Sequence, residues 1–423
     1  MLSTTRLPQL VIPDIVSRHA EDAAFLWTLR SRVVADSDYS LDKLIALDDR
    51  VEAHLHGLRF SGDAGWTLCR SKVVDTSGGE IFPLAVLAFG EGDRSRMFDI
   101  LTLAGVSADA RRGLVSALAW LDGRTAGRWI GRLLDARSAA HRAIGVAACA
   151  CRREDPGRTL ATSVDDADPI LRRRAIRAAG ELKRGDLLGR VATHLTDADE
   201  GCRLWAAWSL TLHGDRRGLP SLVKWLGRGD GFERSALQLA FRAMSVEDGR
   251  SSIRALAAEP RTARSAVAAA GVLGDATCMP WLIDQMKSPG LARAAGETFS
   301  MITGVNLADA HLDQPRPSAT DVNDVAEDLP APDDDRNLPW PSPSRIAEWW
   351  QVHHHEFRGG IRYLAGQPVD GRTLRFVLAN GRQRQRAAAA VELAFREPDV
   401  VLFEVRARGN QQRRRLREIA LES

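Results

Sequence analysis

The sequence predicts a mostly α-helical protein built as an α-solenoid, with an N-terminal helical cap and a small C-terminal α+β module. The first observation is a unit of two short helices that recurs through the middle of the 423-residue chain. Its clearest copy runs from Asp168 to Leu195, where a tight turn joins the two helices. The second observation is that both ends lack this recurrence. Periods of about 20 to 50 residues are typical of solenoids, and two helices per unit indicate the helical class.

The recurrence is strongest in a column of arginines, one in the first helix of each unit. The column consists of Arg112, Arg142, Arg173, Arg203, Arg234, Arg264 and Arg293. Their intervals are 30, 31, 30, 31, 30 and 29 residues, and apolar or small residues stand two and six positions after each arginine. Because small side chains let neighbouring units approach closely, we expect the first helices to stack. We expect the arginines to bridge to the loop of the previous unit.

Short polar residues mark where the predicted units begin. Aspartates stand three to five residues before four of the column arginines, where a helix N-cap belongs: Asp109, Asp168, Asp199 and Asp230. A partial unit, Ile81–Phe89 followed by Met97–Leu103, begins the array. The array is therefore predicted to cover residues 79–305.

The repeat pattern resembles HEAT repeats of the short, PBS-lyase-like kind. This resemblance implies antiparallel helix pairs stacked into a curved superhelix, with the second helices lining the concave face. The candidates for partner binding are basic residues on those second helices: Arg128, Arg132, Arg158, Arg190, Lys224, Arg228 and Arg254. Acidic residues are interspersed with them, so the face lacks the single-sign stripe that phosphate binding needs, and nucleic acid is not favoured as a partner. Three tryptophans could stack bases, but their apolar neighbours favour core packing: Trp205, Trp208 and Trp225.

Residues 1–78 are predicted to form a helical cap on the first end of the array. Apolar residues at helical spacing indicate helices over Ile15–Val34 and Leu41–Leu58. A solenoid needs such a cap because its terminal repeat would otherwise expose an apolar face. Potential metal ligands occur in the same helices: His19, Glu21, Asp22, Asp48, Glu52, His54 and His56. Glu52 and His54 are two residues apart, which splits them across the helix, so solvated charges and buried or capping histidines are favoured over a metal site.

Beyond the array, residues 306–343 are predicted to be an acidic, proline-rich linker and residues 344–423 a small α+β module. The elements predicted for the module are a helix at 343–357 capped by Ser344, a strand at 373–378, a helix at 383–394, a strand at 400–405 and a basic tail at 411–419. Consecutive helical residues point in different directions, so His353, His354 and His355 cannot all bind one metal. The arginines at 413–415 could contact an anionic partner, although a solvated helix is the commoner outcome.

Composition favours a soluble protein with a sizeable core. Hydrophobic residues make up 44% and charged residues 27%, and the net charge of +3 gives no global preference for nucleic acid or a membrane surface. The five cysteines form no C-x-x-C pair, which suits a reducing compartment. Neither a signal peptide nor an apolar run near the roughly 18 residues of a transmembrane helix is present. No G-x-S-x-G elbow, P-loop or H-E-x-x-H motif occurs, so we expect a cytoplasmic, non-enzymatic protein without cofactor or metal.

Four flanking stretches resemble a proteobacterial protein family for which no activity is established. They are HAEDAAFLWTLR at 19–30, LDDRVEAHLHGLRFSG at 47–62, GIRYLAGQPV at 360–369 and GRQRQRAAAAVELAF at 381–395. The family has a HEAT-like middle between these blocks. Its members are often encoded beside components and effectors of type VI secretion systems, which implies an adaptor or chaperone role.

Three functions follow as hypotheses. The first is a scaffold or adaptor that binds another protein, such as a secretion effector or a spike-associated protein. The alternative is a HEAT-like nucleic-acid-binding or repair protein. A metal-dependent enzyme built on His19, Glu52 and His54 is less favoured. The sequence leaves open the oligomeric state and the face of the solenoid that binds.

Overall fold

The computed structural model describes residues 11–316 and 335–422, and the rest of the predicted linker lies outside them. The chain divides into two compact units. The N-terminal unit comprises residues 1–35, 39–190 and 404–423, and the C-terminal unit comprises residues 36–38 and 191–403. This division places the last twenty residues of the chain with its first helices. None of the helices in the described residues combines the length and apolar composition that crossing a bilayer requires.

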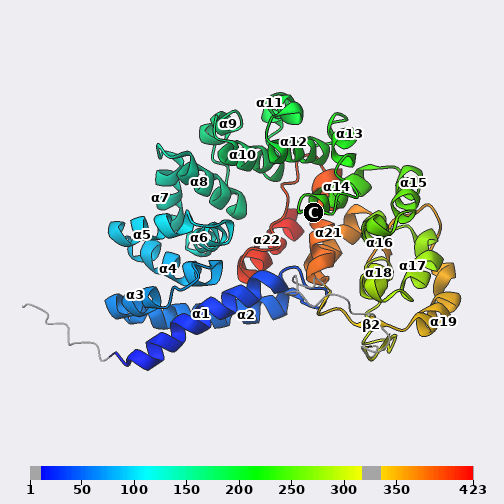
Figure 1. Ribbon diagram of the computed structural model, residues 1–423, viewed down its shortest axis with the longest axis horizontal. Helices are drawn as coiled ribbons and strands as arrows, with labels where there is room; N and C mark the ends of the chain where they lie inside the picture. The colour runs from blue at the N-terminus through cyan, green and yellow to red at the C-terminus, as the bar shows by residue number, and fades with distance from the viewer. Residues whose placement is uncertain (1–10, 317–334, 423) are drawn as a thin grey trace, which may run out of the picture. The chain divides into compact units, whose positions relative to one another are not determined.

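Helices make up the N-terminal unit (Figure 1). The first three are α1 (Pro13–Val33), α2 (Leu41–Phe60) and α3 (Gly62–Ser71). Helix pairs follow: α4 (Gly78–Glu91) with α5 (Arg94–Ala104), α6 (Ala108–Trp120) with α7 (Gly123–Leu134), α8 (Ala139–Arg152) with α9 (Arg158–Ser163), and α10 (Pro169–Glu181) with α11 (Leu188–Thr193), which contains the boundary between the units. The unit is completed by α22 (Gly409–Glu422). The predicted helices at 15–34, 41–58, 81–89 and 97–103 are confirmed to within a few residues.

The C-terminal unit continues the helix pairs and adds short strands. Its repeat helices are α12 (Glu200–Leu212), α13 (Gly218–Val223), α14 (Glu233–Ala243), α15 (Val246–Ala257), α16 (Ala263–Leu273), α17 (Met279–Gln285) and α18 (Pro289–Thr303). The remaining elements are α19 (Pro343–His353), α20 (Gly371–Asn380), α21 (Gln383–Arg396), and two antiparallel strand pairs, β1 (Asp313–Gln314) with β2 (Trp340–Pro341) and β3 (Tyr363–Leu364) with β4 (Gln367–Pro368). The predicted fold class, a mostly α solenoid with a small α+β region near its C-terminus, is confirmed.

Side-chain caps explain where several repeat helices begin. The Asp168 carboxylate accepts hydrogen bonds from the amides of Ile170 and Leu171, and Asp199 caps α12 in the same way. The predicted cap at Asp109 is wrong, because Ser107 caps α6 and Asp109 instead accepts from the Gly78 amide of the neighbouring layer at 2.6 Å.

In four units an arginine at or beside the predicted column position donates to the loop before its helix, whereas Arg264 and Arg293 contact Gly290 and Asp335 instead. Arg142 and Arg203 each donate to two backbone carbonyls in the loop before their helix. In α10 this is done by Arg172 rather than Arg173, and in α6 by Arg111 rather than Arg112. The position is fixed by geometry, because each of these arginines stands four residues after the N-cap of its helix.

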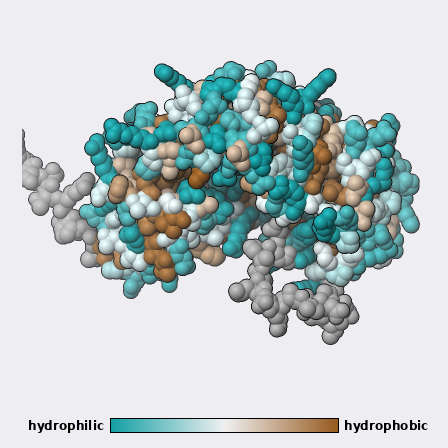
Figure 2. Space-filling model, turned by 45° about the horizontal axis from the view of Figure 1, so that its top comes forward, coloured by the Kyte–Doolittle hydropathy of each residue, from teal (hydrophilic) through white to brown (hydrophobic). Residues whose placement is uncertain are grey.

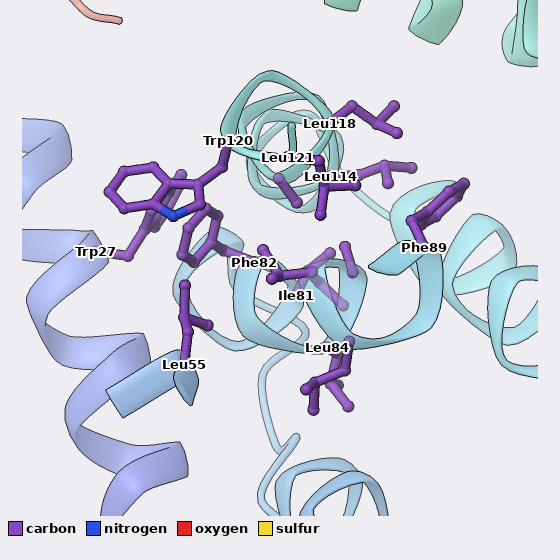
Figure 3. Close-up of a cluster of buried hydrophobic side chains, with 14 of the residues drawn as sticks. Trp27, Leu55, Ile81, Phe82, Leu84, Phe89, Leu114, Leu118, Trp120 and Leu121 are labelled. Carbon is purple, nitrogen blue, oxygen red and sulfur yellow. The ribbon is translucent and has the colours of Figure 1, made fainter. Parts of the chain in front are cut away.

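Small residues on the first helices allow backbone to approach backbone. A Cβ added at Gly113 of α6 would overlap the Gly78 carbonyl at the start of α4. Around this contact, Trp27 stacks on Phe82 with ring centroids 5.4 Å apart, and Phe82 meets the Trp120 ring edge-on at 5.3 Å (Figure 3). These rings belong to a core that joins α1, α2, α4 and α6.

The expectation that the second helices line the inner face is wrong for the N-terminal unit. Helix α22 packs on α2 and reaches the C-terminal ends of α6 and α8, whereas α5, α7 and α9 lie on the opposite side of the stack (Figure 1). The first helices contact one another in sequence from α4 to α10, and their small residues make this the shorter side of the stack.

Two strands expected in the C-terminal module are absent at the predicted positions. Residues 373–378 lie inside α20, where Leu374, Val377 and Leu378 are buried at helical spacing and Asp370 caps the helix by accepting from the Thr373 amide. Residues 400–405 form no strand. Ser344 is not a cap either, because Ser342 occupies the N-cap position of α19. The predicted helix at 383–394 is confirmed as α21.

Candidate protein-binding cleft

The N-terminal unit contains a half-open cleft of about 400 Å³. Its apolar floor comes from Val86 and Leu87 of α4 and from Leu121, which follows α6. Five charged side chains line the cleft around this floor: Glu52, Arg59, Glu91, Asp122 and Arg408. The cleft is therefore assembled from helices early in the chain and a residue close to its C-terminal end.

Glu52 contacts two of the other charged side chains that line the cleft, or lies beside them. Its carboxylate accepts hydrogen bonds from Arg59 Nη1 and from the Trp120 indole nitrogen, both at 2.6 Å. Arg408 Nη2 lies 3.1 Å from the same carboxylate. Burial raises the pKa of the Glu52 carboxyl, but the hydrogen bonds from Arg59 and Trp120 outweigh it and hold that pKa below its ordinary value. Glu52 is thus an anion that positions three donors.

Two guanidinium groups contact the Trp120 ring. The Arg408 guanidinium carbon lies 4.5 Å from the ring centroid and that of Arg30 lies 5.3 Å from it. The indole is itself 3% exposed, because it also packs in the core described above. The buried ring therefore helps to hold these two guanidinium groups in place.

A buried ion pair fixes the segment that delivers Arg408. Arg30 of α1 and Asp48 of α2, 5% and 2% exposed, pair through the Arg30 Nε atom at 2.5 Å. Arg30 also donates to the carbonyls of Arg406 and Ala407, at 3.0 and 2.9 Å. Asp48 Oδ2 accepts the Gly409 amide at 2.7 Å, which caps α22 from another helix.

The charged groups that line the cleft have partners within the fold. No histidine, cysteine or lysine is among the residues that line it, all of which belong to the described part of the chain. Its charged groups stabilise the fold: Glu91 pairs with Arg96 at 2.5 Å, and Asp122 caps α7 by accepting from the Arg124 and Thr125 amides. The cleft offers donors, acceptors and an apolar floor, which are the features of a recognition surface.

The metal-like residues of α1 and α2 are brought partly together. His19 Nδ1 and His54 Nδ1 lie 3.0 Å apart, and Asp22 Oδ2 is 3.8 Å from His54 Nδ1. Asp48 pairs with Arg30, and Glu52 pairs with Arg59. His56 lies 3.4 Å from Glu52, and Glu21 pairs with Lys72. Among the described residues, no group of three or more histidine, cysteine or acidic side chains has an arrangement that could hold a metal ion.

The basic residues predicted on the second helices are all exposed. Arg128 and Arg132 both lie over the Trp129 ring, with guanidinium carbons 4.9 and 4.4 Å from the ring centroid. Arg190 pairs with Asp165, and Arg228 pairs with Glu200 at 2.7 Å. Arg158, Lys224 and Arg254 complete the set. The seven are distributed over both units, whereas the cleft belongs to the N-terminal unit.

Other residues that the sequence marks as candidates pack against or pair with neighbouring side chains. The three repeat tryptophans are buried, and Trp205 meets Trp208 edge-on at 5.5 Å, so the expectation of core packing is confirmed. His353 stacks on Trp349 with ring centroids 4.1 Å apart. The basic tail is a helix whose Arg413 pairs with Asp42 at 2.6 Å.

Exposed apolar side chains do not form one extended area on the face shown in Figure 2, where hydrophobic residues gather in separate places among hydrophilic ones. The most exposed large ones in the described residues include Val74, Phe60 and Phe98, at 81%, 72% and 72%. Single exposed apolar residues are ordinary on protein surfaces. The cleft is therefore the better-defined candidate.

Arg59, Trp120 and Arg408 were missed in the sequence. The repeat pattern does not mark Trp120, because the position eight residues after each column arginine carries no common residue type. No local pattern could place Arg408 beside Trp120, since 288 residues separate them in the chain.

The fold defines a helical-repeat protein. Residues 158–242 match the HEAT-repeat family, so this part of the chain consists of HEAT repeats. An X-ray structure of YibA from Escherichia coli is similar with a TM-score of 0.36 and 15% sequence identity, over 59% of this chain and 95% of that one. No curated protein matches the chain. HEAT repeats commonly mediate binding between proteins.

Proposed function

We propose that the protein is a non-enzymatic scaffold or adaptor that binds another protein at the cleft around Trp120. The observation that carries the proposal is the 400 Å³ cleft in which Glu52 holds Arg59, Arg408 and the Trp120 indole in fixed positions. Fixed donors lose little side-chain entropy when a partner binds, so they favour affinity.

The family resemblance suggests which partner to test first. A secretion effector or a spike-associated protein fits the adaptor role that the resemblance implies. Support from the chain itself is chemical: Arg59 and Arg408 line the cleft, and arginine is one of the residue types that most often dominate the energy of protein interfaces.

The test is quantitative co-purification from the native host with the full-length chain and mass spectrometry. We expect Arg59→Glu to reduce recovery of the specific partner about tenfold or more, because it places two carboxylates against each other in the cleft wall. Arg261→Glu is the matched control, since Arg261 is 82% exposed and lies in the C-terminal unit. Equal recovery with Arg59→Glu and the control would contradict binding at the cleft.

The basic residues of the second helices provide a second docking surface for the same function. Arg128 and Arg132 are its best-defined members, because both lie against Trp129 on the outer side of α7. The double variant Arg128→Glu/Arg132→Glu belongs in the same co-purification series. Loss of the partner with this variant, and not with Arg59→Glu, would place binding on the outer surface.

A further inference from the structure

Residues 404–422, here called the C-terminal strap, attach to the N-terminal unit through polar contacts. The strap contains six arginines and three glutamates, which leaves a charge of +3: Arg406, Arg408, Arg413, Arg414, Arg415, Arg417, Glu404, Glu418 and Glu422. Its partners include carboxylates of α2. Arg408 lies at Glu52, Arg413 at Asp42, and the Gly409 amide at Asp48.

Further contacts place the strap across the ends of the first helices. Arg415 donates to the Arg152 carbonyl at the end of α8, and Glu404 pairs with Arg153 at 3.2 Å. Gln412 is fully buried, yet its amide nitrogen donates to the carbonyls of Val405 and Ala407 within the strap itself. Gln412 therefore links residues 405–407 to the first turn of α22.

The hydrophobic core of the N-terminal unit is built without the strap. The buried cluster that joins α1, α2, α4, α6 and α8 contains none of the residues 404–422. Removing the strap would uncover the face of Trp120 under Arg408 and the side chain of Ile45 beside Gly409. Hydrogen bonds from the buried Arg30 and to the buried Asp48 hold the start of the strap. The exposed pair Arg413–Asp42 weakens as salt rises, because the Debye length shrinks from about 10 Å at 0.1 M to about 3 Å at 1 M.

The surface under the strap has a definite chemistry. It presents the α2 carboxylates Asp42, Asp48, Asp49 and Glu52 beside the face of the Trp120 ring. Acidic groups beside an indole complement arginine, which pairs with carboxylates and stacks on aromatic rings. Close approach at one point adds a shape requirement, because a Cβ on Gly409 would overlap Ile45 of α2.

We propose that this acidic surface is a docking groove for an arginine-rich helix with a glycine at its start, and that the strap is its intramolecular occupant. The proposal rests on the proposed scaffold function and names the class of partner segment and its regulation. A partner helix of the same chemistry exchanges with the strap. While the strap is bound, only the cleft is accessible to a partner. Release of the strap exposes the whole groove.

The test releases the strap in the full-length chain and then supplies it as a separate peptide. Gly409→Ala places a methyl group against Ile45. We expect hydrogen exchange in residues 409–419 to rise about tenfold or more, while α2 and α4 stay protected. A labelled synthetic peptide of residues 404–422 should then bind this variant at least about tenfold more tightly than the wild type. That binding should weaken about tenfold between low and high salt.

Gly131→Ala is the matched control, because a Cβ there has nothing within 4 Å and Gly131 lies in α7 of the same unit. Exchange that rises equally in the strap and in α2 would make the strap a structural part of the fold and overturn the proposal. Failure of the released variant to bind the peptide would also overturn it. Neither readout involves the native partner, so a wrong scaffold function would appear separately, as unchanged co-purification.

Discussion

Asp48 shows how much depends on single side chains in this protein. It lies on a predicted helix among residues that look like solvated charges, yet it is 2% exposed and pairs with the buried Arg30. The same carboxylate caps α22 through the Gly409 amide. One residue therefore connects α1, α2 and the strap, and it does so with both of its oxygens.

Replacing Asp48 tests this role. Asp48→Asn leaves the Arg30 charge buried without a counter-charge, so we expect the free energy of unfolding of the N-terminal unit to fall by about 3 to 5 kcal/mol. Chemical denaturation measures it. Asp49→Asn is the control, because Asp49 is the exposed neighbour and should change stability by about 0.5 kcal/mol or less. Similar losses for both variants would refute the special role of Asp48.

His54 gives the N-terminal unit a dependence on pH. Burial lowers the pKa of His54, and His19 and Arg50 lower it further against the opposing effect of Asp22. Below the ordinary histidine pKa the unfolded chain therefore binds the proton more readily than the folded one, so stability falls as the pH falls.

The change that isolates this effect is His54→Gln. We expect the wild type to lose more stability than the variant when the pH is lowered from about 7.5 to about 5.5, and the comparison of their denaturation midpoints at the two pH values measures it. Parallel pH dependence in the two proteins would show that other groups are responsible.

At the scale of elements, packing of first helix on first helix determines the stack. Gly113 of α6 sits where any side chain would overlap the backbone of α4 at Gly78. Glycine weakens a helix intrinsically, so its presence in the middle of α6 is explained by this close approach. The same rule of small residues underlies the spacing that predicts the repeats.

Gly113→Ala should therefore destabilise the protein although alanine is the better helix former. We expect a loss of about 1 to 3 kcal/mol from overpacking. Gly127→Ala in α7 should instead gain about 0.5 to 1 kcal/mol, because a Cβ there meets nothing within 4 Å. Thermal denaturation of both variants measures these changes in stability. Higher stability in both variants would mean that the contact between α4 and α6 relaxes to accept the added methyl group.

At the scale of the whole molecule, the chain has two compact units with separate buried ion networks. In the C-terminal unit, Glu392 is 4% exposed and is approached by Arg242 at 3.2 Å, Arg362 at 3.4 Å and Arg396 at 2.7 Å. Burial lowers the pKa of Arg242 to about 10, against the opposing effect of Glu392. The network joins α14 and α21 with the segment before β3.

Glu392→Gln should therefore destabilise the C-terminal unit by about 3 kcal/mol or more. Hydrogen exchange mapped by mass spectrometry should show loss of protection in residues 191–403 and little change in α1 to α6. The control is Glu397→Gln, which removes a half-buried partner of Arg375. Loss of protection spread evenly over both units would show that they unfold as one.

The sequence by itself determined the class of fold, because stacked repeats must present the same small, apolar and capping residues at each layer. The arginines at 142 and 203 and the caps at 168 and 199 follow from local spacing, and the structure confirms them. The register errors at Arg112 and Arg173 arose because several arginines adjoin each cap. The missed helix α20 arose because its short apolar run fits either period. The four sequence segments proposed as domains stay a prediction.

Only the tertiary structure decided where the cleft lies and what completes it. Arg408 reaches Glu52 and Trp120, and Gly409 reaches Asp48, across more than 280 residues of chain. No periodicity carries that information, because these contacts join segments that are far apart in the sequence. Local spacing fixes each layer of this protein, whereas the candidate binding surface exists only because the strap returns to the first helices.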